Sequence, residues 1–158
     1  MLLSELLTPD AVTTRLKATN KRDAIAELVA LLESANRLES RGEILDRVLR
    51  REAMMSTGIG NGVAIPHGKA RAVDRMLAAC AVSPEGIEFD SSDREPAYLF
   101  ILLVSPENAG TPHVKVLGNI SRLLKEDSVR KGLRTADSAG AFLSALKNAE
   151  ARYLAPTA

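Results

Sequence analysis

Apolar residues recur with helical spacing in the first third of the chain. Four of them share the spacing i, i+3, i+4 and i+7: Ile25, Leu28, Val29 and Leu32. A helix places residues with this spacing on one face. Asn20 is a good N-cap residue, so we predict an amphipathic helix from there to about Ser34. Residues 12–17 alternate and are rich in β-branched side chains, which predicts a strand before the helix.

A second helical pattern begins at residue 40. Ser40 and Glu43 have the Ser-x-x-Glu spacing of a capping box. The apolar residues that follow would form its buried face: Ile44, Leu45, Val48 and Leu49. The pattern fades between Arg51 and Met54, so Arg51 would lie near the helix end. A cation is favourable there, and its long side chain could reach a neighbouring site or only cap the helix.

Three apolar runs in the middle of the chain predict strands. Residues 63–65 would form a short strand with His67 at its end, and residues 76–82 a buried strand that stops at the turn residues 83–86. Residues 97–104 are apolar on both faces, which is typical of a central strand covered by helices on both sides. The polar residues 90–95 would form a loop.

Helical patterns return after the last strand. Thr111 and Pro112 predict a helix start, with Thr111 as the cap and Pro112 at the first helical position, and the helix runs to about Lys125. His113 falls in its first turn, where unpaired N–H groups and the helix dipole favour an anion. Asp127 and Asp137 would cap two further short helices, the last of which buries these apolar side chains: Phe142, Leu143 and Leu146.

These elements predict an α/β fold in which helices cover both faces of a central sheet. No repeat or long linker divides the chain, so residues 1–148 are expected to form one domain, followed by a short, frayed C-terminal tail at residues 149–158. The pattern leaves the order of the strands open.

Composition narrows the possible functions. The chain has 158 residues, 46% of them hydrophobic, with 21 basic and 20 acidic side chains. It therefore has no large excess of positive charge that would favour binding to nucleic acid. Only 3% of residues are aromatic and none is Trp, which removes the stacking surfaces of a single-strand binder. Cys80 is the single cysteine, so the chain cannot form an internal disulfide or a cysteine-based zinc site, and a cytoplasmic, reducing setting is expected.

Neither the start of the chain nor its longest apolar run predicts a membrane protein. Residues 1–9 lack a basic region and carry Glu5 within their apolar part, unlike a signal peptide. Residues 97–104 are far shorter than the roughly 20 residues that a membrane helix needs. We therefore expect a soluble protein.

The most unusual segment is residues 58–69, which has glycine at 58, 60 and 62 and holds His67 between Pro66 and Gly68. Its glycine spacing is not G-x-G-x-x-G, and it follows a helix rather than a strand. It is no P-loop either, because five residues separate Gly62 from Gly68 and Ala70 stands where magnesium needs Ser or Thr. The chain also lacks H-E-x-x-H for zinc and Gly-x-Ser-x-Gly for a hydrolase.

The remaining chemistry is a histidine that acts as a nucleophile. A neutral imidazole is available near pH 7, and one ring nitrogen can attack phosphorus while the other is held as a hydrogen-bond donor. Phosphoryl transfer then needs charge and donors around the oxygens, which Arg51, His113 and N–H groups near Gly68 could supply. A lone loop histidine with a purely structural role is the alternative.

Two segments carry a resemblance to a known family. Arg51-Glu52 together with residues 56–68, Ser-Thr-Gly-Ile-Gly-Asn-Gly-Val-Ala-Ile-Pro-His-Gly, resembles the active-site signature of the fructose/mannitol class of enzyme IIA of the bacterial phosphoenolpyruvate-dependent phosphotransferase system. Residues 111–124 resemble the family's second histidine segment, which opens a helix and ends here in Ser-Arg-Leu-Leu. The resemblance covers nearly the whole chain.

The resemblance implies a role for each matching residue. His67 matches the histidine that is phosphorylated on Nε2, His113 the partner histidine that helps to bind the phosphoryl group, and Arg51 the arginine that stabilises it. It also implies an HPr-like phosphocarrier as donor, no nucleotide or metal cofactor, and a mixed central sheet between helices. Ser56 and Gly68 are weaker candidates for phosphoryl binding, as is Lys69, which could instead be a solvated surface residue.

The amino-acid sequence of residues 56–62 and the length of the chain look most like those of the nitrogen-regulatory branch of this family. Its members control other proteins through their phosphorylation state. The alternative is a sugar-transport IIA that passes the phosphoryl group to a separate IIB component.

Overall fold

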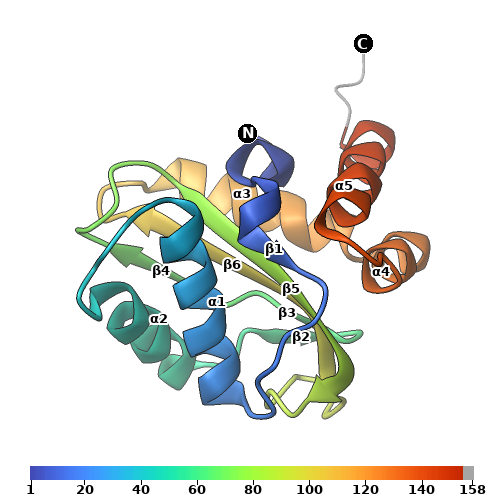
Figure 1. The fold of residues 1–158 in the computed structure, drawn as a ribbon, viewed down its shortest axis with the longest axis horizontal. Helices are drawn as coiled ribbons and strands as arrows, with labels where there is room; N and C mark the ends of the chain where they lie inside the picture. The colour runs from blue at the N-terminus through green and yellow to red at the C-terminus, as the bar shows by residue number, and fades with distance from the viewer. Residues whose placement is uncertain (155–158) are drawn as a thin grey trace.

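Strand β6, Ala97–Pro106, is the centre of the sheet (Figure 1). The computed structural model describes residues 1–154 of the chain. On one side β6 pairs with the antiparallel strand β5, Leu77–Ile87. On the other side it pairs with two short parallel strands, β3 at Val63–Ala64 and β4 at His67–Ala70. The predicted central strand is therefore confirmed.

Two further strands complete the sheet. β1, Val12–Thr13, pairs in parallel with β5, and β2, Gly58–Gly60, pairs antiparallel with β3. The order is β1-β5-β6-β3-β2, with β4 also on β6. Parallel and antiparallel pairs thus make a mixed sheet, as the resemblance implies.

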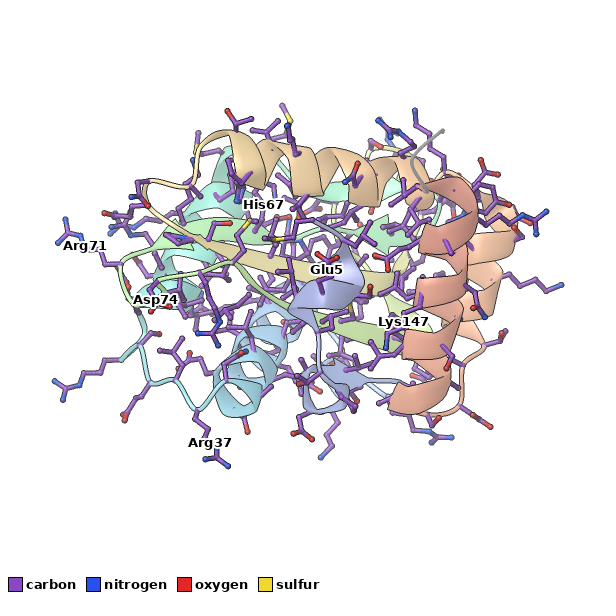
Figure 2. All side chains as sticks on the ribbon, turned by 90° about the horizontal axis from the view of Figure 1, so that it is seen from above. Glu5, Arg37, His67, Arg71, Asp74 and Lys147 are labelled. Atoms are coloured by element: carbon purple, nitrogen blue, oxygen red, sulfur yellow. The ribbon has the colours of Figure 1, made fainter. Side chains whose placement is uncertain are left out.

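Helices lie on both faces of this sheet. α1, Lys21–Ala35, packs on β5, and α2, Glu43–Met54, packs beside it on β4. α3, Thr111–Leu123, runs along the opposite face, which the view in Figure 2 shows clearly. α4, Asp127–Arg134, and α5, Ala139–Tyr153, pack on each other at one end (Figure 1). The predicted helix–sheet–helix layering is confirmed.

The buried core is mainly aliphatic, as the composition suggests. Nearly every residue of β6 is buried, and the largest fully buried side chains include three aromatic ones: Phe89, Phe100 and Phe142. Phe89 and Phe100 meet edge to face with ring centroids 5.5 Å apart, an arrangement that aromatic rings prefer. Within residues 1–154, none of the helices has the length and apolar character of a membrane span.

The N-terminal strand is much shorter than predicted. Two 3₁₀ turns, η1 at Leu3–Leu6 and η2 at Pro9–Ala11, precede the two-residue strand β1. After β1 the Thr13 hydroxyl accepts a hydrogen bond from the N–H of Arg15 at 3.3 Å. Such a local side-chain bond turns the backbone and competes with the ladder of a sheet. The prediction of a strand through residue 17 was therefore wrong.

The predicted capping box of α2 was also wrong. α2 begins at Glu43, and its N-cap is Gly42 with φ of 88°. The Glu43 carboxylate does not reach back to Ser40 but accepts from the N–H groups of Arg71 and Ala72, at 3.0 and 2.8 Å. Because these donors are distant in the chain, tertiary folding offered the carboxylate a partner that the local pattern could not reveal.

Three other predicted caps lie one residue away from the observed ones. Thr111 is the first residue of α3, and Gly110 takes the N-cap position. Asp127 is likewise the first residue of α4, not its cap. Ser138 caps α5 in place of Asp137, because its hydroxyl accepts from the N–H of Ala141 at 3.0 Å.

The last helix is longer than predicted. α5 continues through the expected frayed start at Ala149 as far as Tyr153, while α3 ends before the expected Lys125. Glu150 is buried, and its Oε2 accepts from the N–H of Ser4 at 3.1 Å. This contact ties α5 to the N-terminal segment, so the helix is held by packing. Residues 155–158 lie outside the described part, and the division of the chain at residue 148 stays a prediction.

The turn expected at residues 83–86 lies within a strand. β5 runs to Ile87 and includes the turn residues. Its pairing register with β6 shifts between Val82 and Ile87, and Gly86 within this interval has φ of 82°. A bulge of this kind bends a strand without ending it. The turn residues therefore marked an irregularity and not an end.

The glycine-rich segment forms a β-hairpin. β2 and β3 are joined by Asn61 and Gly62, whose φ angles are 58° and 76°. Positive φ at both central residues is the signature of the type I′ turn that Asn-Gly favours. The hairpin packs closely on the loop after β5, since a Cβ on Gly58 would lie 2.9 Å from the Cα of Ser91.

We expect Gly58→Ala to destabilise the fold by about 1–3 kcal/mol, because the new methyl group would overlap the backbone of Ser91. Gly118→Ala is the matched control, since nothing lies within 4 Å of that position in α3 and alanine is the better helix former. Urea unfolding of both variants and the wild type measures the difference. Equal stability of Gly58→Ala and the wild type would contradict the close packing of the hairpin.

Candidate active site

His67 is the first residue of β4, and its ring is held in one tautomer. Its Nδ1 lies 2.8 Å from the carbonyl oxygen of Ile65. A carbonyl oxygen only accepts, so Nδ1 carries the proton and Nε2 keeps its lone pair. Burial lowers the pKa of His67, and the charge of Arg51 lowers it further, whereas the bond to Ile65 raises it. The neutral ring therefore presents Nε2 as a nucleophile.

Successive side chains of β4 point to opposite faces of the sheet, and this places the site between α2 and α3. His67 pairs with Leu103 of β6, and its ring faces the ring of His113, with centroids 5.6 Å apart. The next residue, Gly68, faces the other side, where a Cβ would lie 3.3 Å from Val48 of α2. β4 pairs only with β6 among the described residues. Side chains from α2 can therefore reach His67 around its free edge.

His113 comes from the first turn of α3, as predicted, and is buried. Its Nδ1 lies 2.6 Å from the hydroxyl oxygen of Ser105 at the end of β6. Burial lowers the pKa of His113 to about 4, and the nearby charges of His67 and Lys69 act in the same direction. His113 is therefore neutral at pH 7.

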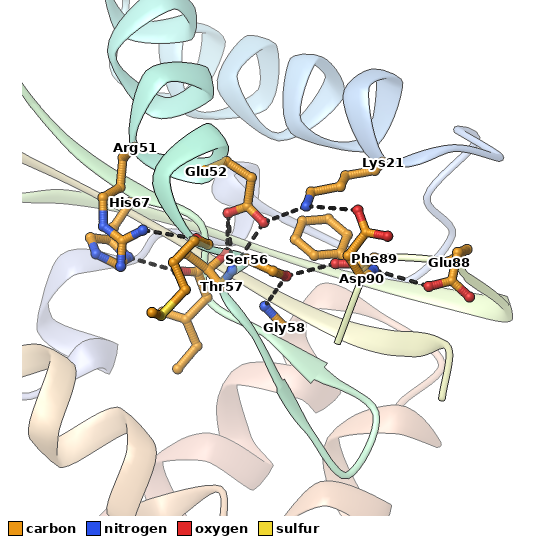
Figure 3. A network of polar contacts seen from close by, with 12 residues as sticks. Lys21, Arg51, Glu52, Ser56, Thr57, Gly58, His67, Glu88, Phe89 and Asp90 are labelled. Carbon is orange, nitrogen blue, oxygen red and sulfur yellow. Dashed lines mark hydrogen bonds and ion pairs between the residues drawn. The ribbon is translucent and has the colours of Figure 1, made fainter. Parts of the chain in front are cut away.

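Arg51 lies in the last turn of α2, where the sequence predicted it, beside His67 (Figure 3). Its Nη1 donates to the carbonyl oxygen of Met55 at 2.9 Å. The two histidines and this arginine line one pocket of about 390 Å³. The other residues that line it are Arg47, Arg50, Met54, Gly68 and Lys69. The fold thus brings together all three principal site residues that the sequence predicted.

The three weaker candidates differ in their positions. Gly68 and Lys69 line the pocket with His67. Ser56 is not among the lining residues; its hydroxyl donates to the carbonyl oxygen of Phe89 at 2.7 Å and accepts from the N–H of Gly58 at 3.1 Å. These bonds hold the turn before β2, and a phosphoryl contact of Ser56 stays a prediction.

A buried carboxylate, Glu52, to which the sequence patterns assigned no role, supports the backbone beneath His67. Glu52 accepts from the N–H and the hydroxyl of Thr57, at 2.9 and 2.6 Å, and pairs with the ammonium of Lys21 at 2.9 Å (Figure 3). The Thr57 carbonyl oxygen then accepts from the N–H of Ile65 at 3.0 Å. Hydrogen bonds therefore run from Glu52 to the residue that orients His67.

The sequence did hold a signal for Glu52. It follows Ile44 and Val48 at intervals of four, so it falls on the buried stripe of α2. A charged residue on such a stripe needs partners. Ser105 gave no comparable signal, because serine is common at the end of a strand before proline. For metals, residues 1–154 contain no group of three or more His, Cys, Asp or Glu side chains that could hold an ion.

Comparison with known proteins decides the family. Residues 5–149 match the model of the family described as "Phosphoenolpyruvate-dependent sugar phosphotransferase system, EIIA 2". The chain belongs to this family. Its members carry a phosphohistidine intermediate, so this phosphotransfer domain is an enzyme component.

Relatives come from both branches of the EIIA family. The chain is 36% identical to a nitrogen regulatory protein of Bradyrhizobium diazoefficiens, over 92% of this chain and 95% of that protein. It is 34% identical to the fructose-specific EIIABC component of Bacillus subtilis, over 90% of this chain but only 22% of that longer protein. The crystal structure of nitrogen regulatory protein IIA-Ntr from Neisseria meningitidis superposes with a TM-score of 0.84, at 31% identity, over 90% of this chain and 97% of that one.

The lowered pKa of His113 predicts a pH dependence of stability. The unfolded chain binds a proton on this residue below its ordinary pKa of 6.5, but the folded protein binds it only near 4. Stability from His113 is therefore full above pH 6.5 and is lost as the pH falls toward 4, by at most about 3 kcal/mol.

Denaturant unfolding between pH 8 and pH 4 measures this loss. In His113→Gln the residue no longer titrates, so the curve of stability against pH should be flatter in that interval than for the wild type. Subtracting the two curves leaves the share that belongs to His113 together with its coupling to His67, because His67 titrates in both proteins. Parallel curves would contradict the assignment.

Proposed function

We propose that His67 accepts a phosphoryl group on Nε2 from an HPr-like phosphocarrier. The observation that carries this proposal is the hydrogen bond from Nδ1 to the Ile65 carbonyl, which leaves the Nε2 lone pair for attack. The bond between phosphorus and the donor's nitrogen breaks as the bond to Nε2 forms. The proton of His67 stays on Nδ1 throughout, so the ring needs no separate base.

Arg51 and His113 are the groups that bind the phosphoryl oxygens in this proposal. Arg51 supplies a fixed positive charge beside His67, and His113 supplies an uncharged donor. Charges and donors arranged in advance around a transferring phosphoryl group are the main source of rate in such reactions. Gly68 and Lys69 line the same pocket and are secondary candidates for these contacts.

Exposed apolar side chains around the pocket support a protein as the phosphoryl donor. Met54 lines the pocket and is 81% exposed, and Val114, which follows His113 in α3, is 66% exposed. Large apolar side chains gathered at a reactive site are typical of surfaces that bind another protein. A small-molecule donor would need a deeper and more enclosed site.

The role that we propose is that of a nitrogen-type regulatory IIA. The relative from Bradyrhizobium named a nitrogen regulatory protein matches over nearly the full length of both chains, which supports this branch. Phosphorylation would add about two negative charges next to Arg51 and Lys69. A partner that binds the face around His67 would then distinguish the two states.

The second candidate is a sugar-transport IIA that passes the phosphoryl group to a separate IIB component. The similarity to a fructose-specific EIIABC component supports it, because that protein's name joins A, B and C parts. Both candidates use His67 and need neither a nucleotide nor a metal, and the chemistry of neutral histidine requires none. In either role we place the protein in the cytoplasm, where a thiol such as Cys80 stays reduced.

Phosphorylation with phosphoenolpyruvate, enzyme I and HPr tests the site. We expect an acid-labile label on the wild type, none on His67→Ala, and labelling of Arg51→Ala that is at least roughly tenfold slower. Arg75→Ala is the control, because Arg75 is exposed and, among residues 1–154, its one ion pair is with the neighbouring Asp74. Label that persists on His67→Ala would refute the phosphorylation site.

Transfer from the phosphorylated protein separates the two roles. We expect the label to stay on His67 when candidate IIB domains are added, and the phosphorylated and unphosphorylated forms to capture different partners from an extract of the source cells. The His67→Ala protein is the control for the unphosphorylated form. Fast and specific loss of the label to one IIB domain would favour the sugar-transport role.

A further inference from the structure

The hydrogen bond between Ser105 and His113 has a direction that burial decides. Ser105 is completely buried near the end of β6, and its hydroxyl oxygen lies 2.6 Å from Nδ1 of His113. Within residues 1–154, this nitrogen is the only side-chain or backbone partner that the hydroxyl has. If the hydroxyl accepted from an N–H at Nδ1, its own proton would be buried without an acceptor.

Leaving a buried donor without an acceptor is energetically costly. The hydroxyl of Ser105 therefore donates to Nδ1, which must then carry a lone pair. Since the His113 ring is neutral at pH 7, its one proton is on Nε2, the nitrogen on the far side of the ring from Ser105.

We propose that Ser105 is a positioning residue that holds the proton of His113 on Nε2, so that neutral His113 donates this N–H to the phosphoryl group on His67. The proposal rests on phosphorylation of His67. It separates the roles of two neutral rings whose centroids are 5.6 Å apart.

The two histidines are then in opposite tautomers, each set by one oxygen. The Ile65 carbonyl can only accept, so it places the proton of His67 on Nδ1 and leaves Nε2 as a nucleophile. The buried hydroxyl of Ser105 donates, so it places the proton of His113 on Nε2 and makes that nitrogen a donor. This difference explains why His67 attacks phosphorus while His113 binds its oxygens.

Nitrogen-15 NMR of the unphosphorylated wild type at pH 7.5 tests the tautomers directly. We expect two-bond ring correlations to show Nδ1 of His113 as unprotonated and Nε2 as protonated, and the reverse for His67. In Ser105→Ala the His113 signals should shift toward a mixture of tautomers. Ser83→Ala is the control, because Ser83 is also buried but bonds to Gly86 in the bulge of β5.

Phosphorylation kinetics give a second readout. We expect Ser105→Ala to accept the phosphoryl group from phospho-HPr roughly tenfold more slowly at saturation, with little change in KM, because the lost interaction acts on the transferring group and not on docking. Ser83→Ala should behave like the wild type.

The outcomes distinguish this inference from the proposed function. A wild-type His113 with its proton on Nδ1 would overturn the inference even if His67 is phosphorylated normally, and so would unchanged His113 signals and rates in Ser105→Ala. Failure of the wild type to accept any label would instead overturn the proposed function. The tautomer of His113 in the wild type is measured without any variant. The inference can therefore be overturned even if Ser105→Ala does not fold.

Discussion

The hydrogen bond between the Ile65 carbonyl and Nδ1 of His67 is the constraint on which the site depends. It determines both which nitrogen is free to react and where the ring points. Two hydrogen bonds fix the backbone of Ile65. Its N–H donates to the carbonyl oxygen of Thr57, and the N–H of Thr57 donates to the buried carboxylate of Glu52. His67, the first residue of β4, thus acquires the rigidity of the sheet and of α2, which a reacting group needs.

Burial decides the charge of the site. Both histidines have a lowered pKa because they are removed from water, so both rings stay neutral near pH 7 while Arg51 keeps its charge. A protonated His67 could not attack, and two protonated rings this close would repel each other. The same desolvation that costs stability at acid pH therefore keeps the site reactive at neutral pH.

The sequence predicted the elements whose pattern is strongly periodic or wholly apolar. The helix after Asn20 and the central strand β6 both follow from such patterns. At two places prediction failed because a residue's partner is far away in the chain. Glu43 has the spacing of a local cap but bonds to residues 71 and 72, and Glu150 extends α5 because it reaches Ser4.

For the site, the sequence by itself determined the residue types: a histidine held between Pro66 and Gly68, a second histidine at a helix start, and an arginine at a helix end. These follow from local features and from the resemblance to the enzyme IIA family. Only the tertiary structure decided which nitrogen of each ring carries the proton, because Ile65 and Ser105 are brought to His67 and His113 by backbone geometry and by the packing of α3 on β6. A tautomer is set by a contact in space, and the spacing of residues along a chain does not encode it.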